Sequence, residues 1–226
     1  MNKLLCSLFV FLIICSVSAQ DFSGSFDMHL TQAYQNGNTR TDTLSYFFGK
    51  NRTALIIHGR RNQPDMRLIF NFTDTTITNL FEMNGKKGGY ILPMDNEHWP
   101  GLAHIEKDAL PCDLNQMDQS GESKMIEGYS CYKVLADNSE YHGELWVTPE
   151  IPLSMLTILS YQSVGKGKSE KELELYEQME VNCLPLEMNL ESKLGKADVQ
   201  LTIENISTVV PENIFSTKGH EVSRMD

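Results

Sequence analysis

Apolar and polar side chains alternate along most of the first hundred residues of this chain. In residues 24–34, for example, Phe26, Met28 and Leu30 are each separated by one polar residue. A period of two is typical of a β-strand with one buried face, because successive side chains of a strand point to opposite sides of the sheet. Short turns rich in glycine and asparagine separate these runs, as in an antiparallel meander. The alternation therefore predicts a mainly β protein.

The same pattern, or a run of β-branched and apolar residues, recurs in the second half of the chain. The predicted strands are residues 24–34, 41–48, 53–58, 67–72, 75–83, 90–93, 129–136, 141–148, 184–192 and 197–206. Residues 152–164 have leucine at every third position, which predicts a short apolar helix that begins near Pro152. Ser169 and Glu172 form a possible capping box for a second, charged helix. Residues 211–215 resemble a helical turn, and the tail after them is polar.

The apolar helix must be buried, and a sheet that curves around it is the natural way to bury it. We therefore expect a strongly curved antiparallel sheet, an unclosed barrel, covered by one or two helices. Residues 94–123 lose the alternation and contain Pro100 and Pro111. They predict a long excursion, packed over the sheet or partly mobile, with a helical turn near residues 104–109; loops of this length are usually functional or disordered.

Residues 1–19 have the composition of a signal peptide, with Lys3 followed by an apolar run and the small residues Val17 and Ala19. We expect this segment to be removed and residues 20–226 to form a single domain. The protein would then be exported, to the periplasm or beyond, and a Gram-negative envelope is suspected. No later apolar run is long enough for a transmembrane helix, so we expect no such segment in the mature chain.

The chain is acidic, with 30 aspartates and glutamates against 19 lysines and arginines. Only Lys3 is charged within residues 1–19, so the mature chain would carry 18 basic residues and a net charge of −12. Nucleic acids and anionic membranes are bound through basic surfaces, and both are therefore unexpected partners. The oligomeric state cannot be inferred from these features.

Three cysteines remain after residue 19, and an exported chain meets an oxidising compartment. A disulfide between Cys112 and Cys131 is the preferred pairing, because it closes a loop of about twenty residues and would stabilise the fold by roughly 3 kcal/mol. Three buried thiols, with Cys183 as the third, are the alternative. The sequence does not decide between them.

No residue pattern indicates catalysis, a metal site or a cofactor. The six histidines are scattered, and His98 and His104 provide at most two of the three or four ligands that a metal needs. Ser130 stands in a sequence that resembles a nucleophile elbow, but it lies inside a predicted strand. We expect no catalytic residue, no metal and no cofactor. An enzyme that uses His98 and His104 is the least favoured alternative.

Several motifs resemble exported bacterial proteins of the domain-of-unknown-function family 4412. They are residues 125–133 (MIEGYSCYK), residues 143–148 (GELWVT) with the apolar helix after them, residues 183–188 (CLPLEM) and residues 210–215 (VPENIF). That family is similar to the periplasmic lipoprotein carriers of the LolA/LolB-like superfamily. The resemblance implies an unclosed, curved sheet with helices over its open mouth and an apolar interior, and it implies a possible lipid or lipoprotein partner.

We expect a non-enzymatic protein that binds a lipid or acyl chain inside the sheet. The ligand-binding residues predicted from strand faces and the apolar helix are Phe70, Tyr90, Trp146, Leu153, Leu156 and Leu159. Trp146 in particular is predicted to lie on the inner face against Leu156 or Leu159. A ligand of this kind requires a cavity of roughly 300 Å³ or more. The alternative is an envelope interaction or sensor module with a solid core.

Overall fold

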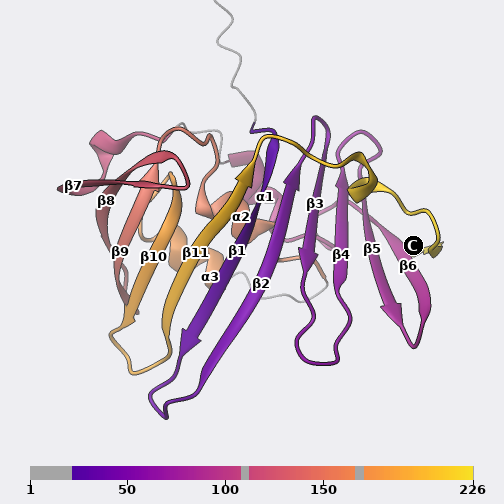
Figure 1. Ribbon diagram of the computed structural model, residues 1–226, viewed down its shortest axis with the longest axis horizontal. Coiled ribbons are helices and arrows are strands. Elements are labelled where there is room, and N and C mark those ends of the chain that lie inside the picture. Colours follow the sequence, from indigo (N-terminus) through magenta and orange to yellow (C-terminus); the bar gives the residue numbers. More distant parts are fainter. Residues whose placement is uncertain (1–21, 108–111, 166–170, 226) are drawn as a thin grey trace, which may run out of the picture.

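A computed structural model describes residues 22–107, 112–165 and 171–225. Within these residues, twelve strands form one continuous sheet in the order β12-β6-β5-β4-β3-β2-β1-β11-β10-β9-β8-β7. All neighbouring strands are antiparallel except β12, which runs parallel to β6. The sheet curves without closing, and the helices lie against one of its faces (Figure 1). The predicted fold class is confirmed.

The strands are β1 (Gly24–Ala33), β2 (Thr39–Phe48), β3 (Arg52–Ile57), β4 (Met66–Asn71), β5 (Thr76–Met83), β6 (Lys86–Pro93), β7 (Asp118–Ile126), β8 (Tyr129–Asp137), β9 (Tyr141–Thr148), β10 (Leu184–Ser192), β11 (Asp198–Ser207) and β12 (Glu221–Arg224). The helices are α1 (Leu102–Lys107), α2 (Met155–Ser160) and α3 (Lys171–Glu177), with the 3₁₀ turns η1 (Leu114–Gln116) and η2 (Glu212–Phe215). All ten predicted strands are present. Among the described residues, no helix has both the length and the apolar composition needed to cross a bilayer.

Three features of the prediction need correction. Strand β7 lies partly inside the segment predicted as an excursion, and β12 lies in the predicted polar tail. The apolar helix begins later than Pro152, because Ser154 caps it: the Ser154 hydroxyl accepts a hydrogen bond from the Thr157 N–H at 3.0 Å. The predicted signal peptide and Ser169 lie outside the described residues.

The two faces of the sheet follow from the pairing of its strands, because residues directly opposite each other point to the same side. The Tyr46 hydroxyl donates to the Ile158 carbonyl of α2, so Tyr46 marks the helix-covered face. Strand pairing extends this face through Met28 to Met188 and Leu145. We call it the inner face, and the opposite one the outer face.

The C-terminal segment covers part of the outer face. After β11, the chain crosses β3, β4 and β5 and reaches the edge of the sheet at β6 (Figure 1). Phe215 is buried there against Ala54, Ile69 and Leu80, and the Arg52 guanidinium stacks 4.8 Å from the centre of the Phe215 ring. This segment therefore gives the outer face a small apolar core of its own.

The disulfide joins Cys112 to Cys183, with their Cα atoms 4.7 Å apart. The predicted Cys112–Cys131 pairing is wrong. Cys131 is a buried free thiol on β8, and burial raises its pKa to about 11. Loop length alone favours Cys131 as the partner of Cys112. In the folded chain, however, Cys112 lies beside the start of β10 and bonds to Cys183, 71 residues away in sequence.

Candidate functional site

Large aromatic side chains fill the inner face over β1 to β5. We call this cluster the aromatic region, and it consists of Phe26, Tyr46, Phe48, Phe70, Trp99 and Tyr161. None of these side chains is more than 5% exposed. The ring centres of Phe70 and Trp99 are 4.6 Å apart, and those of Phe70 and Tyr161 are 4.8 Å apart. The interior is solid in this part of the molecule.

The polar atoms of the aromatic region all have hydrogen-bond partners. Trp99 Nε1 donates to a backbone carbonyl of α2 at 2.7 Å, and the Tyr46 hydroxyl donates to another at 3.1 Å. Thr53 Oγ1 donates to the Tyr161 hydroxyl at 3.2 Å. Burial raises the pKa of Tyr161 to about 12. These bonds fix the rings against α2, so a ligand could enter only by breaking them.

The inner face over β1, β10 and β11 leaves an open hollow of about 160 Å³ under α2 and α3. We call it the methionine pocket, because Met155, Met179 and Met188 all line it. The complete lining is Leu30, Gln32, Asn138, Tyr141, Met155, Leu159, Leu175, Tyr176, Met179, Met188, Leu190 and Val199. Methionine adapts its shape to irregular apolar groups, so this lining suits a flexible apolar ligand.

Strand pairing explains how residues far apart in the sequence meet in the pocket. Leu30 of β1 and Met188 of β10 both lie opposite Leu201 of β11, and Leu190 lies opposite Val199. The pocket is apolar except for the side chains of Gln32, Asn138, Tyr141 and Tyr176. Such a site can hold an apolar chain and leave a polar end near these groups.

The volume limits what can bind. Complete ligand sites are about 300–1,000 Å³, whereas an apolar cavity of about 150 Å³ holds a molecule of benzene size. The methionine pocket, at about 160 Å³, therefore has room for one narrow apolar group. A whole diacyl lipid would not fit.

Only one of the six predicted ligand-binding residues lines this pocket. That residue is Leu159; Leu153 and Leu156 are partly buried and pack against the main core. Phe70 belongs to the aromatic region. Tyr90 lies on the inner face near the β6 edge, where its hydroxyl accepts a hydrogen bond from Asn79 Nδ2 at 3.2 Å.

Trp146 does not occupy its predicted place. It lies opposite Lys133 of β8 and Glu187 of β10, on the outer face, while its neighbours Leu145 and Val147 are fully buried on the inner face. Its ring contacts the Lys124 ammonium, 4.3 Å from the ring centre. The prediction that Trp146 packs against Leu156 or Leu159 is therefore wrong, because the strand faces the other way.

The prediction also missed most of the residues that do line the pocket. Leu30 belongs to the alternation that predicts the first strand, but the predicted ligand-binding residues include none of Leu30, Met155, Met179, Met188 and Val199. The sequence does contain a signal for three of these residues: Leu30, Met188 and Val199 each lie on the apolar face of a strand in which apolar and polar residues alternate. Which alternating strands become neighbours, however, is not visible in the sequence.

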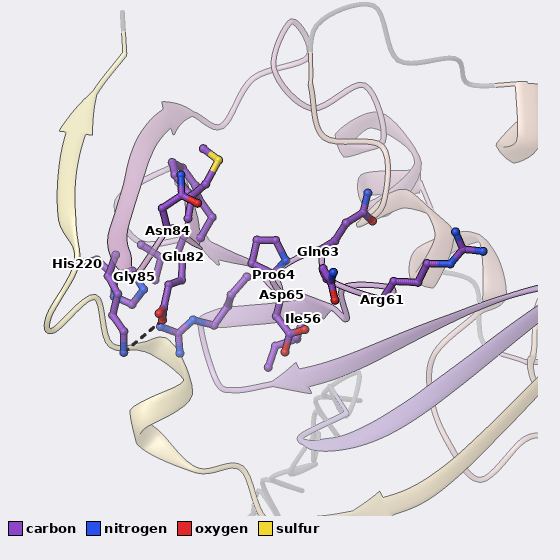
Figure 2. A pocket seen from close by; sticks show the side chains of 15 residues that line it. Ile56, Arg61, Gln63, Pro64, Asp65, Glu82, Asn84, Gly85 and His220 are labelled. Carbon is purple, nitrogen blue, oxygen red and sulfur yellow. Dashed lines mark ion pairs between the residues drawn. The ribbon is translucent and has the colours of Figure 1, made fainter.

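A larger hollow lies at the other end of the molecule, beside the β3–β4 loop and the β5–β6 hairpin (Figure 2). It measures about 860 Å³ and is wide open. Charged side chains of both signs line it, among them Arg61, Asp65 and Glu82, and Lys87 Nζ lies 3.8 Å from the Glu82 carboxylate. Because its walls are polar and exposed, it is less suited than the methionine pocket to an apolar ligand.

A serine, a histidine and an aspartate lie in a row on the outer face. Ser45 Oγ lies 2.8 Å from His58 Nε2, and His58 Nδ1 lies 3.3 Å from Asp65 Oδ2. The order resembles a hydrolase triad. However, the Ser45 hydroxyl donates to Asp27 at 2.5 Å, and Ser45 is only 6% exposed. The row is better described as a link between strands than as a nucleophile and its base.

No group of three or more histidine, cysteine or acidic residues within the described residues could hold a metal ion. His98 Nδ1 lies 2.8 Å from Asp95 Oδ1, and this hydrogen bond lowers the pKa of Asp95. His104 is buried in α1. The two histidines that the sequence singled out therefore lie in structural surroundings.

A family model described as "Domain of unknown function (DUF4412)" matches residues 22–217. A comparison with curated proteins finds no match.

Solved structures provide three further likenesses. One is PNGF-II, which is 12% identical at a TM-score of 0.42; the alignment covers 90% of this chain and 32% of that protein, so this chain spans about a third of its length. A LolA superfamily protein from Nitrosomonas europaea is 11% identical at a TM-score of 0.35, and the alignment covers 88% of this chain and 92% of that protein. A putative outer membrane lipoprotein-sorting protein domain from Vibrio parahaemolyticus is 11% identical at a TM-score of 0.35, and the alignment covers 87% of this chain and 91% of that domain.

Proposed function

The chain belongs to the DUF4412 family, as its motifs predict, and we propose that it is a non-enzymatic binding protein whose methionine pocket holds the end of one alkyl or acyl chain. The observation that supports the proposal most directly is the pocket itself: an open, mainly apolar hollow lined by three methionines, with polar side chains at Gln32, Asn138, Tyr141 and Tyr176. The remainder of the ligand, a lipid or a lipoprotein, would lie outside.

Flexibility of the lining supports this proposal. Met155 and Met188 are almost fully buried, yet the unbranched side chain of methionine can change rotamer around a ligand at little cost. An apolar chain that enters the pocket gains about 0.8 kcal/mol for each CH₂ group removed from water. A pocket of this size, which buries only a few CH₂ groups, then gives modest affinity.

We propose an exported location on two grounds. The first is the predicted signal peptide at residues 1–19. The second is the Cys112–Cys183 disulfide, because disulfides persist mainly in oxidising compartments. The acidic surface supports a partner other than a nucleic acid or an anionic membrane.

The test is whether the purified protein takes up an alkyl chain at this pocket. Native mass spectrometry of the freshly purified protein would report any bound lipid, and after delipidation a dansyl-labelled fatty acid would be titrated and followed by its fluorescence. Val199→Phe adds a ring to the pocket wall and should abolish uptake of the probe.

Ile57→Phe is the matched control. Ile57 is also partly buried on the inner face, but it lies on β3 and does not line the pocket. It should leave uptake unchanged. A wild-type protein that is isolated empty and takes up no probe would overturn the proposal.

The second candidate is an envelope interaction or sensor module. The solid aromatic region and the small volume of the pocket favour it, because both are expected of a protein that works through its surface. The same titration separates the two candidates: absence of bound lipid and of probe uptake supports the interaction module.

A further inference from the structure

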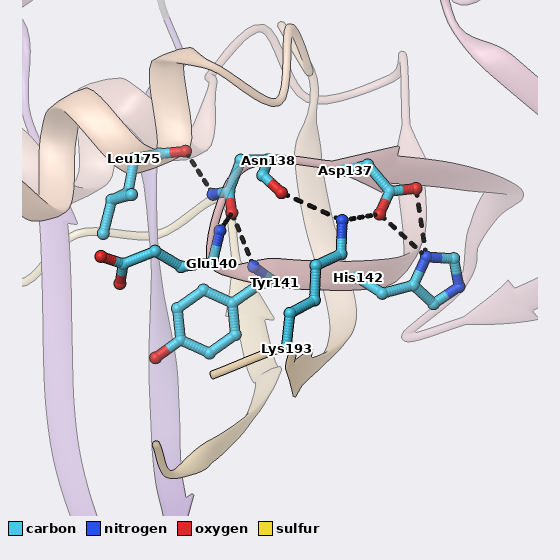
Figure 3. Close-up of polar contacts among 7 residues, drawn as sticks. All are labelled: Asp137, Asn138, Glu140, Tyr141, His142, Leu175 and Lys193. Atoms are coloured by element: carbon cyan, nitrogen blue, oxygen red, sulfur yellow. Dashed lines mark hydrogen bonds and ion pairs between the residues drawn. The ribbon is translucent and has the colours of Figure 1, made fainter. Parts of the chain in front are cut away.

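The turn between β8 and β9 contacts α3 through Asn138, and Asn138 also lines the methionine pocket (Figure 3). Asn138 makes three hydrogen bonds there. Its Oδ1 accepts from the backbone N–H groups of Glu140 at 2.8 Å and Tyr141 at 2.7 Å, which closes the turn. Its Nδ2 donates to the backbone carbonyl of Leu175 in α3 at 2.7 Å. One side chain thus shapes the turn and holds the helix.

The Leu175 carbonyl needs such a donor. The last carbonyls of a helix lose their partners in the chain, and the N–H of Met179 bonds to the Tyr176 carbonyl instead, at 2.9 Å. The Asn138 amide therefore caps the C-terminal end of α3 from outside the helix. Few residue types could do so, because the side chain must supply acceptors to the turn and a donor to the helix at the same time.

The same turn also contacts the N-terminal end of α3. The Glu140 carboxylate lies 3.3 Å from the Lys171 ammonium, and Lys196 of the β10–β11 turn binds the same carboxylate. Lys193 pairs with Asp137 at 2.5 Å on the other side of the turn. The β8–β9 turn thereby connects α3 to the β10–β11 hairpin.

This connection bears on the pocket because its members are also pocket walls. Asn138, Leu175 and Tyr176 all line the hollow, and Met179 follows directly after the helix. The distance from Asn138 to the Leu175 carbonyl therefore sets how closely the last turn of α3 approaches the sheet. A closer approach leaves room for a narrow chain only.

We propose that Asn138 is a positioning residue that sets the width of the methionine pocket and thereby restricts it to an unbranched alkyl chain. This inference rests on the proposed function. To the proposed function it adds Asn138, as the residue that decides which apolar groups the pocket accepts.

Asn138→Asp tests the proposal with little change of shape. One carboxylate oxygen can still accept both turn hydrogen bonds, while the other replaces the donor and faces the Leu175 carbonyl. Two acceptors repel each other, and a negative charge at a helix C-terminus is unfavourable. The last turn of α3 should move away from the sheet, and hydrogen exchange of residues 175–179 should become faster while exchange of β2 and β3 stays unchanged.

Ligand selectivity is the readout that a merely structural role would not change. Two fatty acids of equal length, one unbranched and one with a terminal naphthyl group, which is larger than benzene, would compete against the dansyl-labelled probe. We expect the variant to bind the unbranched acid about fivefold more weakly, as for the loss of one hydrogen bond. The preference between the two acids should shift toward the naphthyl acid, because the pocket is wider.

Asn36→Asp is the matched control. Asn36 also closes a hairpin turn with its side chain, accepting from the Asn38 N–H at 3.0 Å, but it lies in the β1–β2 turn. It should change neither hydrogen exchange in α3 nor selectivity. If the wild type binds the probe and Asn138→Asp shows the same selectivity as the wild type, the inference about Asn138 is overturned and the proposed function stands. No binding by the wild type overturns the proposed function, and the inference with it.

Discussion

The aromatic region and the methionine pocket share one sheet face and one helix, yet one is solid and the other is hollow. The rings of Tyr46, Phe70 and Trp99 are rigid and closely packed, and Tyr46 and Trp99 donate hydrogen bonds to backbone carbonyls of α2. The pocket is lined by Met155 and Met188, whose unbranched side chains have no such bonds to hold them. If the proposed function holds, stability and binding are divided between these two regions: the aromatic region holds the fold, and the methionine pocket can adapt.

Truncation of a large side chain should show this division most strongly. Phe70→Ala removes a fully buried ring from the aromatic region and should cost about 3–5 kcal/mol of unfolding free energy. Met188→Ala enlarges a hollow that already exists and should cost about 2 kcal/mol, at the low end of the usual range. Urea unfolding of both variants is the measurement. Equal losses would contradict the division.

The disulfide is the strongest covalent support of the methionine half, because it fixes the start of β10. In the chain-entropy model, a loop of 71 residues corresponds to about 4 kcal/mol, and measured values usually lie near 2–4 kcal/mol. The double variant Cys112→Ala/Cys183→Ala should therefore unfold at lower urea concentration by an equivalent amount. Cys131→Ala should cost less, because Cys131 makes no cross-link. A larger loss from Cys131→Ala would contradict the assigned pairing.

Local alternation accounts for what the sequence could predict. All ten predicted strands exist, because each carries its own signal of buried and exposed positions. Strands β7 and β12 lacked that signal. Both lie at the edges of the sheet, and most side chains of β7 are exposed, so the DQSGESKMI sequence has no apolar face to display.

Long-range pairing accounts for what the sequence could not predict. The methionine pocket forms only because β1 lies beside β11 and β11 beside β10, which brings Leu30 within reach of Val199 and Met188. The disulfide depends on the same arrangement. The face of Trp146, in contrast, was predictable: His142 and Glu144 share its parity on β9, and charged side chains seldom face a core.

The two tryptophans of the chain report on the two environments separately. Trp99 is fully buried in the aromatic region, and Trp146 is partly exposed on the outer face. Acrylamide should therefore quench the Trp99→Phe variant, which keeps Trp146, and should hardly quench Trp146→Phe. Loss of the contact with Lys124 in Trp146→Phe should cost about 0.5–1 kcal/mol. Equal quenching of the two variants would place Trp146 inside.

The smallest effect that we expect is that of acid on the ion pairs of Glu140, which connect the β8–β9 turn to α3. These ion pairs should weaken as the pH falls. Hydrogen bonds from Lys196 and then Lys171 lower the pKa of Glu140 below its ordinary value of 4.5. A lowered pKa means that the ionised carboxylate stabilises the folded state above pH 4.5, and that this contribution is lost as pH falls through the pKa of the folded protein.

Glu140→Gln removes the charge and should lower the melting temperature by roughly 1–2 °C at pH 7, the scale of an exposed ion pair. The difference from the wild type should close as pH falls below 4.5. Both proteins share every other carboxylate, so the difference between their melting curves isolates Glu140. Because the polar groups of the aromatic region are hydroxyls and an indole, which stay neutral at acid pH, hydrogen exchange in β2 and β3 should not distinguish the two proteins at any pH. A difference there would mean that the two regions are coupled through α2, and the division between them would fail.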